Sequence, residues 1–271
     1  MNYIGTAVFL LALTLSAQTA KISILATTDL HGHIYPYDYF TQTPANYGVA
    51  KIATLVAAER KQSPDALLID AGDTIQGSPL ESVYQTFRST GKLPPQVTIP
   101  ARSLSIDPMM LVMNAMHYDA MTVGNHEFNY GLDNLNAARR VARFPWLSAN
   151  TIASGPNTKP FVPYLEKTIQ GVRVAIVGLT TPAIPTWEKP ENYRGYSWEH
   201  ATVALQRLVK IWGNQPPISS SFARTAASTS KAARTAARTS PGRPPRCLES
   251  TPLFLDIAIA RWRRSSMAIR S

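Results

Sequence analysis

Short apolar runs recur along residues 21–212, and their lengths predict β-strands separated by helices. Residues 21–27, 66–69 and 120–123 are brief aliphatic runs that stop at polar clusters, which is typical of buried strands. Two further runs, YLEKTIQ and VRVAIVGLT, flank Gly171 and are predicted to form two strands joined by a turn.

Helical spacing of apolar residues fills the intervals between these strands. Residues 49–62, 132–143 and 198–212 place apolar side chains three or four positions apart, which predicts amphipathic helices. Pro108 is expected at the first turn of another helix, because proline fits that position. The alternation of strands and helices predicts an α/β domain.

The first twenty residues have a different character and are interpreted as a signal peptide. An uncharged apolar run over residues 4–15 is followed by small residues around Ala17 and Ala20. The run is shorter than the roughly 20 residues of a membrane-spanning helix. The chain is therefore expected to be secreted or periplasmic. The alternative is a buried first strand, because no Lys or Arg precedes the apolar run.

The formal charge of +10 is concentrated in residues 213–271. This basic tail is rich in Ala, Arg, Ser, Thr and Pro, a composition that cannot bury a core and is predicted to be disordered. The tail could bind anions nonspecifically, and a basic arm for nucleic acid or anionic lipid is the competing interpretation. No specific nucleic-acid or membrane partner is expected. The composition also resembles a GC-rich gene translated in the wrong frame.

Side chains able to bind metals follow three of the predicted strands. Asp29 and His31 follow the first strand, Asp73 follows the second, and Asn125 with His126 follows the strand at 120–123. Carboxylate, imidazole and amide ligands suit divalent Zn, Mn, Mg or Fe. Each motif alone is common, and Asp-x-His or Gly-Asp is most often a turn. The three together predict a site for two divalent metal ions at one edge of a sheet.

The ordered series Asp-x-His, Gly-Asp and Gly-Asn-His-Glu resembles the calcineurin-like metallophosphoesterases. Within that family, the stretches TTDLHGHIYPYDYF, GDTIQGSPL, VGNHEFNYGLDNL and TTPAIPTWEK resemble the secreted nucleotidases, and most of all the branch of 2′,3′-cyclic-nucleotide 2′-phosphodiesterase/3′-nucleotidase enzymes. The resemblance covers residues 21–212. It implies an α/β fold, a four-layer α/β/β/α sandwich, incomplete at the C-terminal side. It also implies hydrolysis of nucleotide phosphate esters.

The resemblance assigns roles to individual residues. Asp29 and His31 would bind the first metal, Asp73 would bridge both metals, and Asn125 would bind the second. His126 would be the catalytic histidine, stabilising charge on the phosphoryl group or assisting the leaving oxygen.

Neighbouring polar residues receive weaker assignments. The 5′-nucleotidase branch commonly has an Asp three positions after the histidine, where this chain has Asn129; the difference favours the cyclic-phosphodiesterase branch. Asn129 and His33 are candidates for substrate contacts. Glu127 is predicted to support its loop by hydrogen bonding, and Asp70 has no assigned role.

The resemblance also implies elements that this sequence lacks. After residue 212, a strand ending in His and then a Gly-His-x-His motif would complete both metal shells, yet no histidine follows His200. A second domain that stacks the nucleotide base would also follow. Two hypotheses therefore stand: an impaired phosphoesterase, or a truncated or frameshifted inactive fragment.

Overall fold

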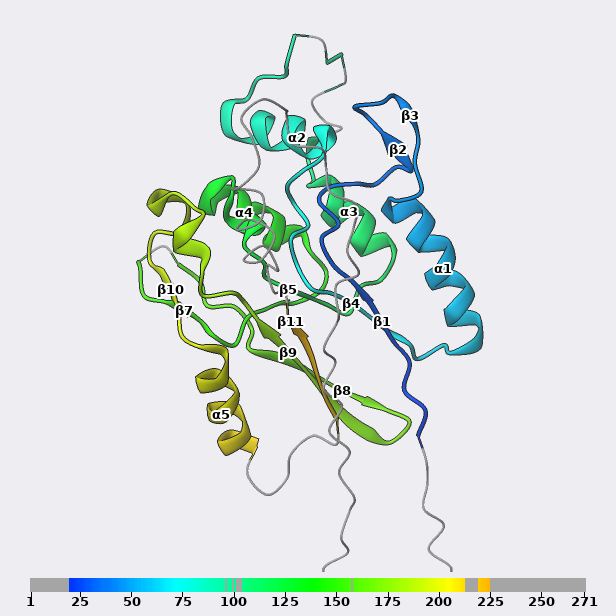
Figure 1. Cartoon of the computed structure of the whole chain (residues 1–271), viewed down its shortest axis with the longest axis vertical. Helices are drawn as coiled ribbons and strands as arrows, with labels where there is room; N and C mark the ends of the chain where they lie inside the picture. Colours follow the sequence, from blue (N-terminus) through cyan, green and yellow to red (C-terminus); the bar gives the residue numbers. More distant parts are fainter. Residues whose placement is uncertain are drawn as a thin grey trace, which may run out of the picture.

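Two β-sheets pack face to face, with helices on both outer sides (Figure 1). The computed structural model describes residues 20–95, 97–98, 100, 104–156 and 158–212, together with the backbone of Ser219–Arg224. The expected α/β fold, a four-layer α/β/β/α sandwich, is confirmed. The predicted signal peptide and most of the predicted tail lie outside the described residues.

The first sheet has four parallel strands in the order β1-β4-β5-β6. The strands are β1 (Ile24–Thr27), β4 (Leu67–Asp70), β5 (Ala120–Thr122) and β6 (Trp146–Leu147). Because all four run the same way, the loops that follow β1, β4 and β5 leave the sheet at a single edge. This edge is where the sequence places its candidate ligands.

Helices connect the parallel strands, and each follows from local sequence. They are α1 (Val49–Gln62), α2 (Pro79–Thr90), α3 (Pro108–Ala115), α4 (Gly131–Val141) and α5 (Ala201–Trp212). Ser78 caps α2 by accepting from the Glu81 N–H, and Asp107 caps α3 by accepting from the Met110 N–H. A proline opens both α2 and α3, as predicted for Pro108.

The second sheet has the order β11-β9-β8. Strands β8 (Tyr164–Ile169) and β9 (Val172–Leu179) form the predicted hairpin, in which Gln170 and Gly171 both have positive φ. Strand β11 (Ser219–Arg224) pairs in parallel with β9, although the sequence predicted a disordered tail there. Backbone pairing with a buried neighbouring strand provides an order that composition alone did not indicate.

Smaller elements complete the connections. Two short ribbons pair β2 (Tyr37–Asp38) with β3 (Thr43–Pro44) and β7 (Thr151–Ala153) with β10 (Tyr196–Trp198). Three 3₁₀ turns follow strands or loops: η2 (His126–Phe128), η3 (Ile184–Thr186) and η4 (Pro190–Tyr193). The sequence predicted that the last helix begins at Trp198. Because β10 occupies residues 196–198, the helix begins instead at Ala201.

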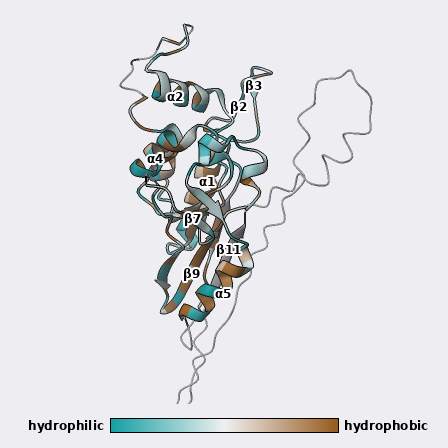
Figure 2. Ribbon diagram, turned by 90° about the vertical axis from the view of Figure 1, so that its left-hand side faces the viewer, coloured by the Kyte–Doolittle hydropathy of each residue, from teal (hydrophilic) through white to brown (hydrophobic). Residues whose placement is uncertain are grey.

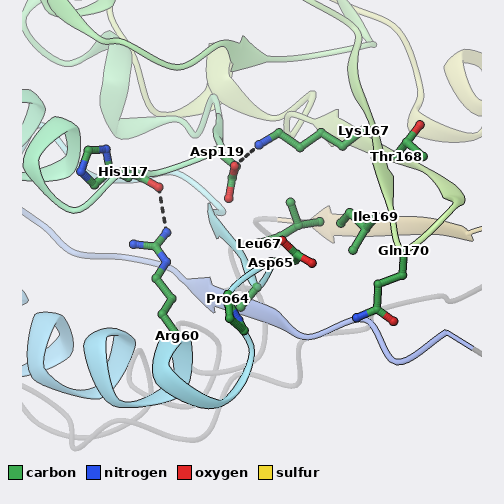
Figure 3. Close-up of a pocket in the computed structure, with 11 residues that line it drawn as sticks. Arg60, Pro64, Asp65, Leu67, His117, Asp119, Lys167, Thr168, Ile169 and Gln170 are labelled. Atoms are coloured by element: carbon green, nitrogen blue, oxygen red, sulfur yellow. Dashed lines mark hydrogen bonds and ion pairs between the residues drawn. The ribbon is translucent and has the colours of Figure 1, made fainter.

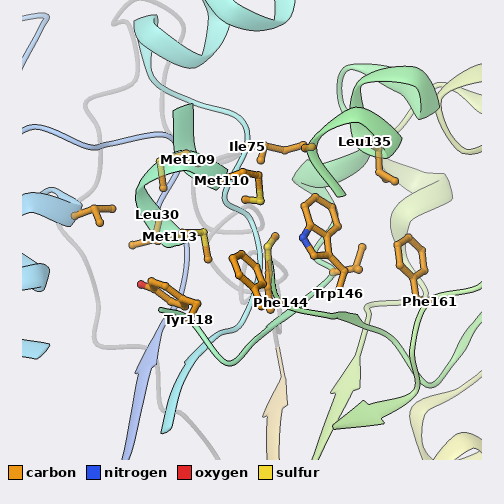
Figure 4. Close-up of a cluster of buried hydrophobic side chains, with 14 of the residues drawn as sticks. Leu30, Ile75, Met109, Met110, Met113, Tyr118, Leu135, Phe144, Trp146 and Phe161 are labelled. Carbon is orange, nitrogen blue, oxygen red and sulfur yellow. The ribbon is translucent and has the colours of Figure 1, made fainter. Parts of the chain in front are cut away.

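Side chains point alternately to the two faces of each sheet, and the buried apolar residues form three clusters. Leu67 and Ile69 of β4 contact Val174 and Ile176 of β9 between the sheets, while Leu68 faces the helices on the other side. The helix side contains the fully buried methionines of α3 and the aromatic rings beside them (Figure 4). Burial of each such side chain contributes about 1.5–3 kcal/mol.

The third part of the core lies beneath α5. Val177 and Leu179 of β9 pack with Ala204 and Leu208 of this helix. Figure 2 shows the apolar residues along β9 and on part of α5. In the portion of the chain that the structure describes, none of the helices has both the length and the apolar character needed to cross a membrane.

Candidate active site

Three loops meet at the carboxyl edge of the first sheet, and backbone hydrogen bonds join them. The Asp29 N–H donates to the Gly72 carbonyl at 3.0 Å, and the His31 N–H donates to the Asp73 carbonyl at 3.0 Å. The His126 N–H donates to Asp73 Oδ1, also at 3.0 Å. Asp73 therefore joins the loops after β1 and β5 to its own loop, and the structure brings together the residues that the sequence singled out.

The backbone at this edge adopts unusual conformations. Asp29, His31 and Asp73 have φ values of 52°, 46° and 61°, in the left-handed region that L-residues seldom adopt. Such positions cost on the order of 1–3 kcal/mol each and persist where surrounding contacts impose them. Gly124 is required for a related reason, because a Cβ there would overlap the Asp73 carboxylate. The loops are therefore held in place by the fold rather than by their own preferences.

His31 is fixed in one tautomer. Its Nδ1 lies 3.0 Å from the Gln76 carbonyl oxygen, which can only accept, so Nδ1 carries the proton. In the neutral ring, Nε2 then has the lone pair, and it lies 3.8 Å from Asp29 Oδ1. An imidazole held this way by a backbone carbonyl is arranged as metal-binding histidines usually are.

His126 lies beside His31, with the two rings edge to face and their centroids 4.9 Å apart. Its Nδ1 contacts Asn129 Oδ1 at 2.6 Å, and Asn129 Nδ2 donates in turn to the Glu188 carboxylate. Asn129 thus contacts the proposed catalytic histidine. Sequence reasoning did not single out Glu188, which lies 59 positions further along in a loop.

Glu127 supports the loops from below, as the sequence predicted. Its buried carboxylate accepts from the N–H groups of Asp73, Thr74 and Gly124 at 3.0, 2.7 and 2.7 Å. Burial raises the pKa of Glu127, the negative charge of Asp73 raises it further, and the N–H donors oppose both effects. These bonds confirm the supporting role and join the loops after β4 and β5.

Asp70 is a second supporting carboxylate, to which sequence reasoning assigned no role. It accepts from Thr27 Oγ1, Thr74 Oγ1 and the Gly72 N–H at 2.6, 2.8 and 2.9 Å. Burial raises the pKa of Asp70 to about 7. The sequence signal was an Asp two residues before a glycine, the pattern of a turn in which the side chain binds its own backbone.

The remaining predicted residues occupy different surroundings. Asn125 is buried between Gly124 and His126, whose N–H groups are bound by Glu127 and Asp73 respectively. His33 packs edge to face against Tyr47, with ring centroids 4.9 Å apart. Burial, followed by the charge of His31, lowers the pKa of His33.

The structure brings several oxygen and nitrogen donors to this edge of the sheet. Across the described residues, no group of three or more His, Cys, Asp or Glu side chains is placed to hold a metal ion. The free Nε2 of His31 and the partly exposed Asp29 carboxylate nevertheless form a pair suited to a divalent ion. Asp29, His31, Asp73 and Asn125 are the residues that would hold such ions.

A pocket of about 510 Å³ lies at the opposite end of the same strands (Figure 3). Arg60 in its wall donates to the carbonyls of Met116 and His117, and Lys167 binds Asp119. The residues that line the pocket include none of the predicted site residues.

The chain is similar in sequence to known phosphoesterases. The family model described as calcineurin-like phosphoesterase matches residues 22–212. The chain is 40% identical over 191 residues to the trifunctional nucleotide phosphoesterase protein YfkN of Bacillus subtilis (strain 168), an alignment covering 66% of this chain and 12% of that protein. It is 31% identical over 199 residues to 2′,3′-cyclic-nucleotide 2′-phosphodiesterase/3′-nucleotidase of Yersinia enterocolitica, covering 70% of this chain and 29% of the relative.

The structural similarity agrees with these matches. The crystal structure of calcineurin-like phosphoesterase YfkN from Bacillus subtilis superposes with a TM-score of 0.62 and 30% identity, over 75% of this chain and 61% of that chain. The chain spans less than a third of the length of either curated relative. Since the family model matches most of the residues that form the two sheets and their site, the chain belongs to the calcineurin-like phosphoesterase family.

Proposed function

We propose that the chain hydrolyses phosphate esters of nucleotides, with 2′,3′-cyclic nucleotides and 3′- or 5′-nucleotides as the substrate class. Members of its family use divalent metals, and the names of the relatives include nucleotide phosphoesterase and 2′,3′-cyclic-nucleotide 2′-phosphodiesterase/3′-nucleotidase. The observation that carries the proposal is the position of Asp73, whose carbonyl and carboxylate bind the loops of His31 and His126.

The proposed chemistry divides between the metals and the chain. Bound divalent metals supply Lewis acidity and an activated water. Asp29 and His31 would hold the first ion, Asp73 would hold both, and Asn125 would hold the second. His126 would use Nε2, because Nδ1 is held by Asn129. When the ring is protonated, the Nε2–H would donate to a phosphoryl or leaving-group oxygen.

The second hypothesis, an inactive chain, rests on the donors that the structure brings together. Across the described residues, no group of three or more His, Cys, Asp or Glu side chains is placed to hold a metal ion. An inactive chain would hydrolyse nothing above background with any divalent metal. Export to the periplasm or cell exterior is part of the first proposal, because residues 1–20 have the pattern of a signal peptide.

Hydrolysis of a 2′,3′-cyclic nucleotide and of a chromogenic phosphodiester, with Mn²⁺ or Zn²⁺, tests the proposal. Asp73→Asn should reduce the rate about 100-fold or more, because even the residues that support metal ligands typically contribute about 10–100-fold. Asp65→Asn, in an exposed turn, is the matched control and should leave the rate unchanged. Activity that survives both chelation and Asp73→Asn would refute a metal site at this edge.

A further inference from the structure

A connected set of polar side chains lies behind the His126 ring. Asn129 Oδ1 contacts His126 Nδ1 at 2.6 Å, and Asn129 Nδ2 donates to Glu188 Oε1. Asn192 Nδ2 donates to Glu188 Oε2 and to the Asn129 carbonyl, both at 3.1 Å. Both carboxylate oxygens of Glu188 are therefore occupied by side-chain amides.

The direction of these bonds determines which ring nitrogen carries the proton. A carboxylate only accepts, so Glu188 holds the NH₂ group of Asn129 towards itself and turns the amide oxygen to His126. That oxygen can be met only by an N–H. His126 is thus held with hydrogen on Nδ1, and Nε2 is kept as the lone pair in the neutral ring.

The fold supplies Glu188 independently of the loop it supports. The Glu188 N–H donates to the carbonyl of Ile184 at 2.9 Å, and Ile184 is fully buried in the core. Glu188 therefore follows the turn η3, after the last strand of the hairpin, while Asn129 follows β5 of the other sheet. The contact joins the two sheets at the proposed site.

We propose that Glu188 is a positioning residue, which through Asn129 fixes the tautomer and orientation of the His126 imidazole. The inference deepens the proposed function, since a fixed Nε2 matters for hydrolysis only if His126 acts on a phosphate ester. The tautomer itself is a property of the folded chain and is measurable without metal or substrate.

The direct test is long-range ¹H–¹⁵N NMR of the full-length ¹⁵N-labelled chain at alkaline pH, where neutral rings are observed. His126 should be the Nδ1–H tautomer in the wild type and should shift towards Nε2–H in Glu188→Ala, because the Asn129 amide is then free to turn. His31 is the internal control, held as Nδ1–H by the Gln76 carbonyl in both proteins. A wild-type Nε2–H ring at His126, or no change in Glu188→Ala, would overturn the inference.

A pair of variants tests whether Glu188 acts by orienting the Asn129 amide or only by stabilising its loop. In Glu188→Gln, the new amide meets NH₂ donors from both Asn129 and Asn192, so one contact is lost. In Asn129→Asp with Glu188→Gln, every donor again has an acceptor, and the carboxylate contacts His126 directly. We expect kcat to fall about 10-fold or more in Glu188→Gln with KM little changed, and to recover in the double variant.

The kcat of the double variant, compared with that of Glu188→Gln, decides this test. A double variant as slow as Glu188→Gln would overturn the positioning role, whereas recovery of kcat supports it. Glu191→Ala, exposed in the same loop, is the matched control and should retain wild-type kcat. A wild-type chain without hydrolytic activity would refute the proposed function alone, because the NMR measurement still decides the role of Glu188.

Discussion

The two ends of the first sheet contain similar residue types, but their side chains have different partners. At the pocket end, Asp119 accepts from Lys167 and from the Leu68 N–H, and Arg60 binds carbonyl groups. At the site end, among the described residues, the buried carboxyl groups have no Lys or Arg partner. These groups are Asp70, Asp73, Glu81, Asp107 and Glu127. Carboxylates without a cationic partner are costly to bury, which suits a site that binds cations.

Backbone strain alone does not distinguish the two ends. His117, beside the pocket, has a φ of 56°, much like Asp29, His31 and Asp73. At His117 the helix end accounts for the conformation, because the Tyr118 N–H returns to the Met113 carbonyl. The strained residues at the site end are instead held by contacts between different loops. The difference indicates that inter-loop bonding marks a functional edge better than φ does.

The largest effect is expected when the hydrogen bonds of Glu127, below the site, are broken. Glu127→Gln replaces an acceptor oxygen by an NH₂ group facing backbone donors, so we expect the free energy of unfolding to fall by about 3 kcal/mol or more. Urea denaturation measures the change. Glu166→Gln, at an exposed position of β8, is the control. A loss below about 1 kcal/mol would show that the loops do not depend on Glu127.

A smaller effect concerns pH. Burial raises the pKa of Asp107 to about 6, from a usual value of 3.8. The folded state therefore holds this proton more tightly than the unfolded chain, so the stabilisation is complete below pH about 4 and is lost as the pH rises to about 6. The loss is up to about 3 kcal/mol.

Asp107→Asn keeps the helix cap and removes this titration. The variant should lose less stability than the wild type between pH 4 and 6, as measured by urea denaturation at each pH. Parallel curves for the two proteins would contradict the raised pKa. The result would also weaken the contrast between the two ends of the sheet.

The smallest effect is expected at the pocket end. Lys167→Ala removes a partly exposed ion pair, which typically contributes about 1 kcal/mol or less. Thermal unfolding at low and high salt measures it, and the wild-type advantage should shrink with salt. A loss as large as that of Glu127→Gln would remove the distinction between the two ends.

Much of the fold could be predicted from the sequence because its local signals agree with one another. Residues 49–62 were predicted as a helix, which is α1, and the hairpin around Gly171 is confirmed. Helix α2 was missed although Ser78, Pro79 and Glu81 form a capping pattern, because the stretch was interpreted only as a site loop. Strand β11 depends on pairing with β9, which no local pattern reveals.

The residues of the candidate site could likewise be predicted only in part. Asp29, His31, Asp73, Asn125 and His126 stand directly after strands, so their assembly at one edge follows from the parallel order of the sheet. Their roles as ligands and catalyst stay predictions. Glu188 could not be found from spacing, because it reaches the site from a turn after the second sheet.

Calorimetric titration of the full-length chain with Mn²⁺ measures whether the donors after β1, β4 and β5 hold a divalent metal. We expect saturable binding to the wild type and to Asp65→Asn, and loss of binding in Asp73→Asn. Absence of binding to the wild type, or binding that Asp73→Asn leaves unchanged, would contradict this expectation.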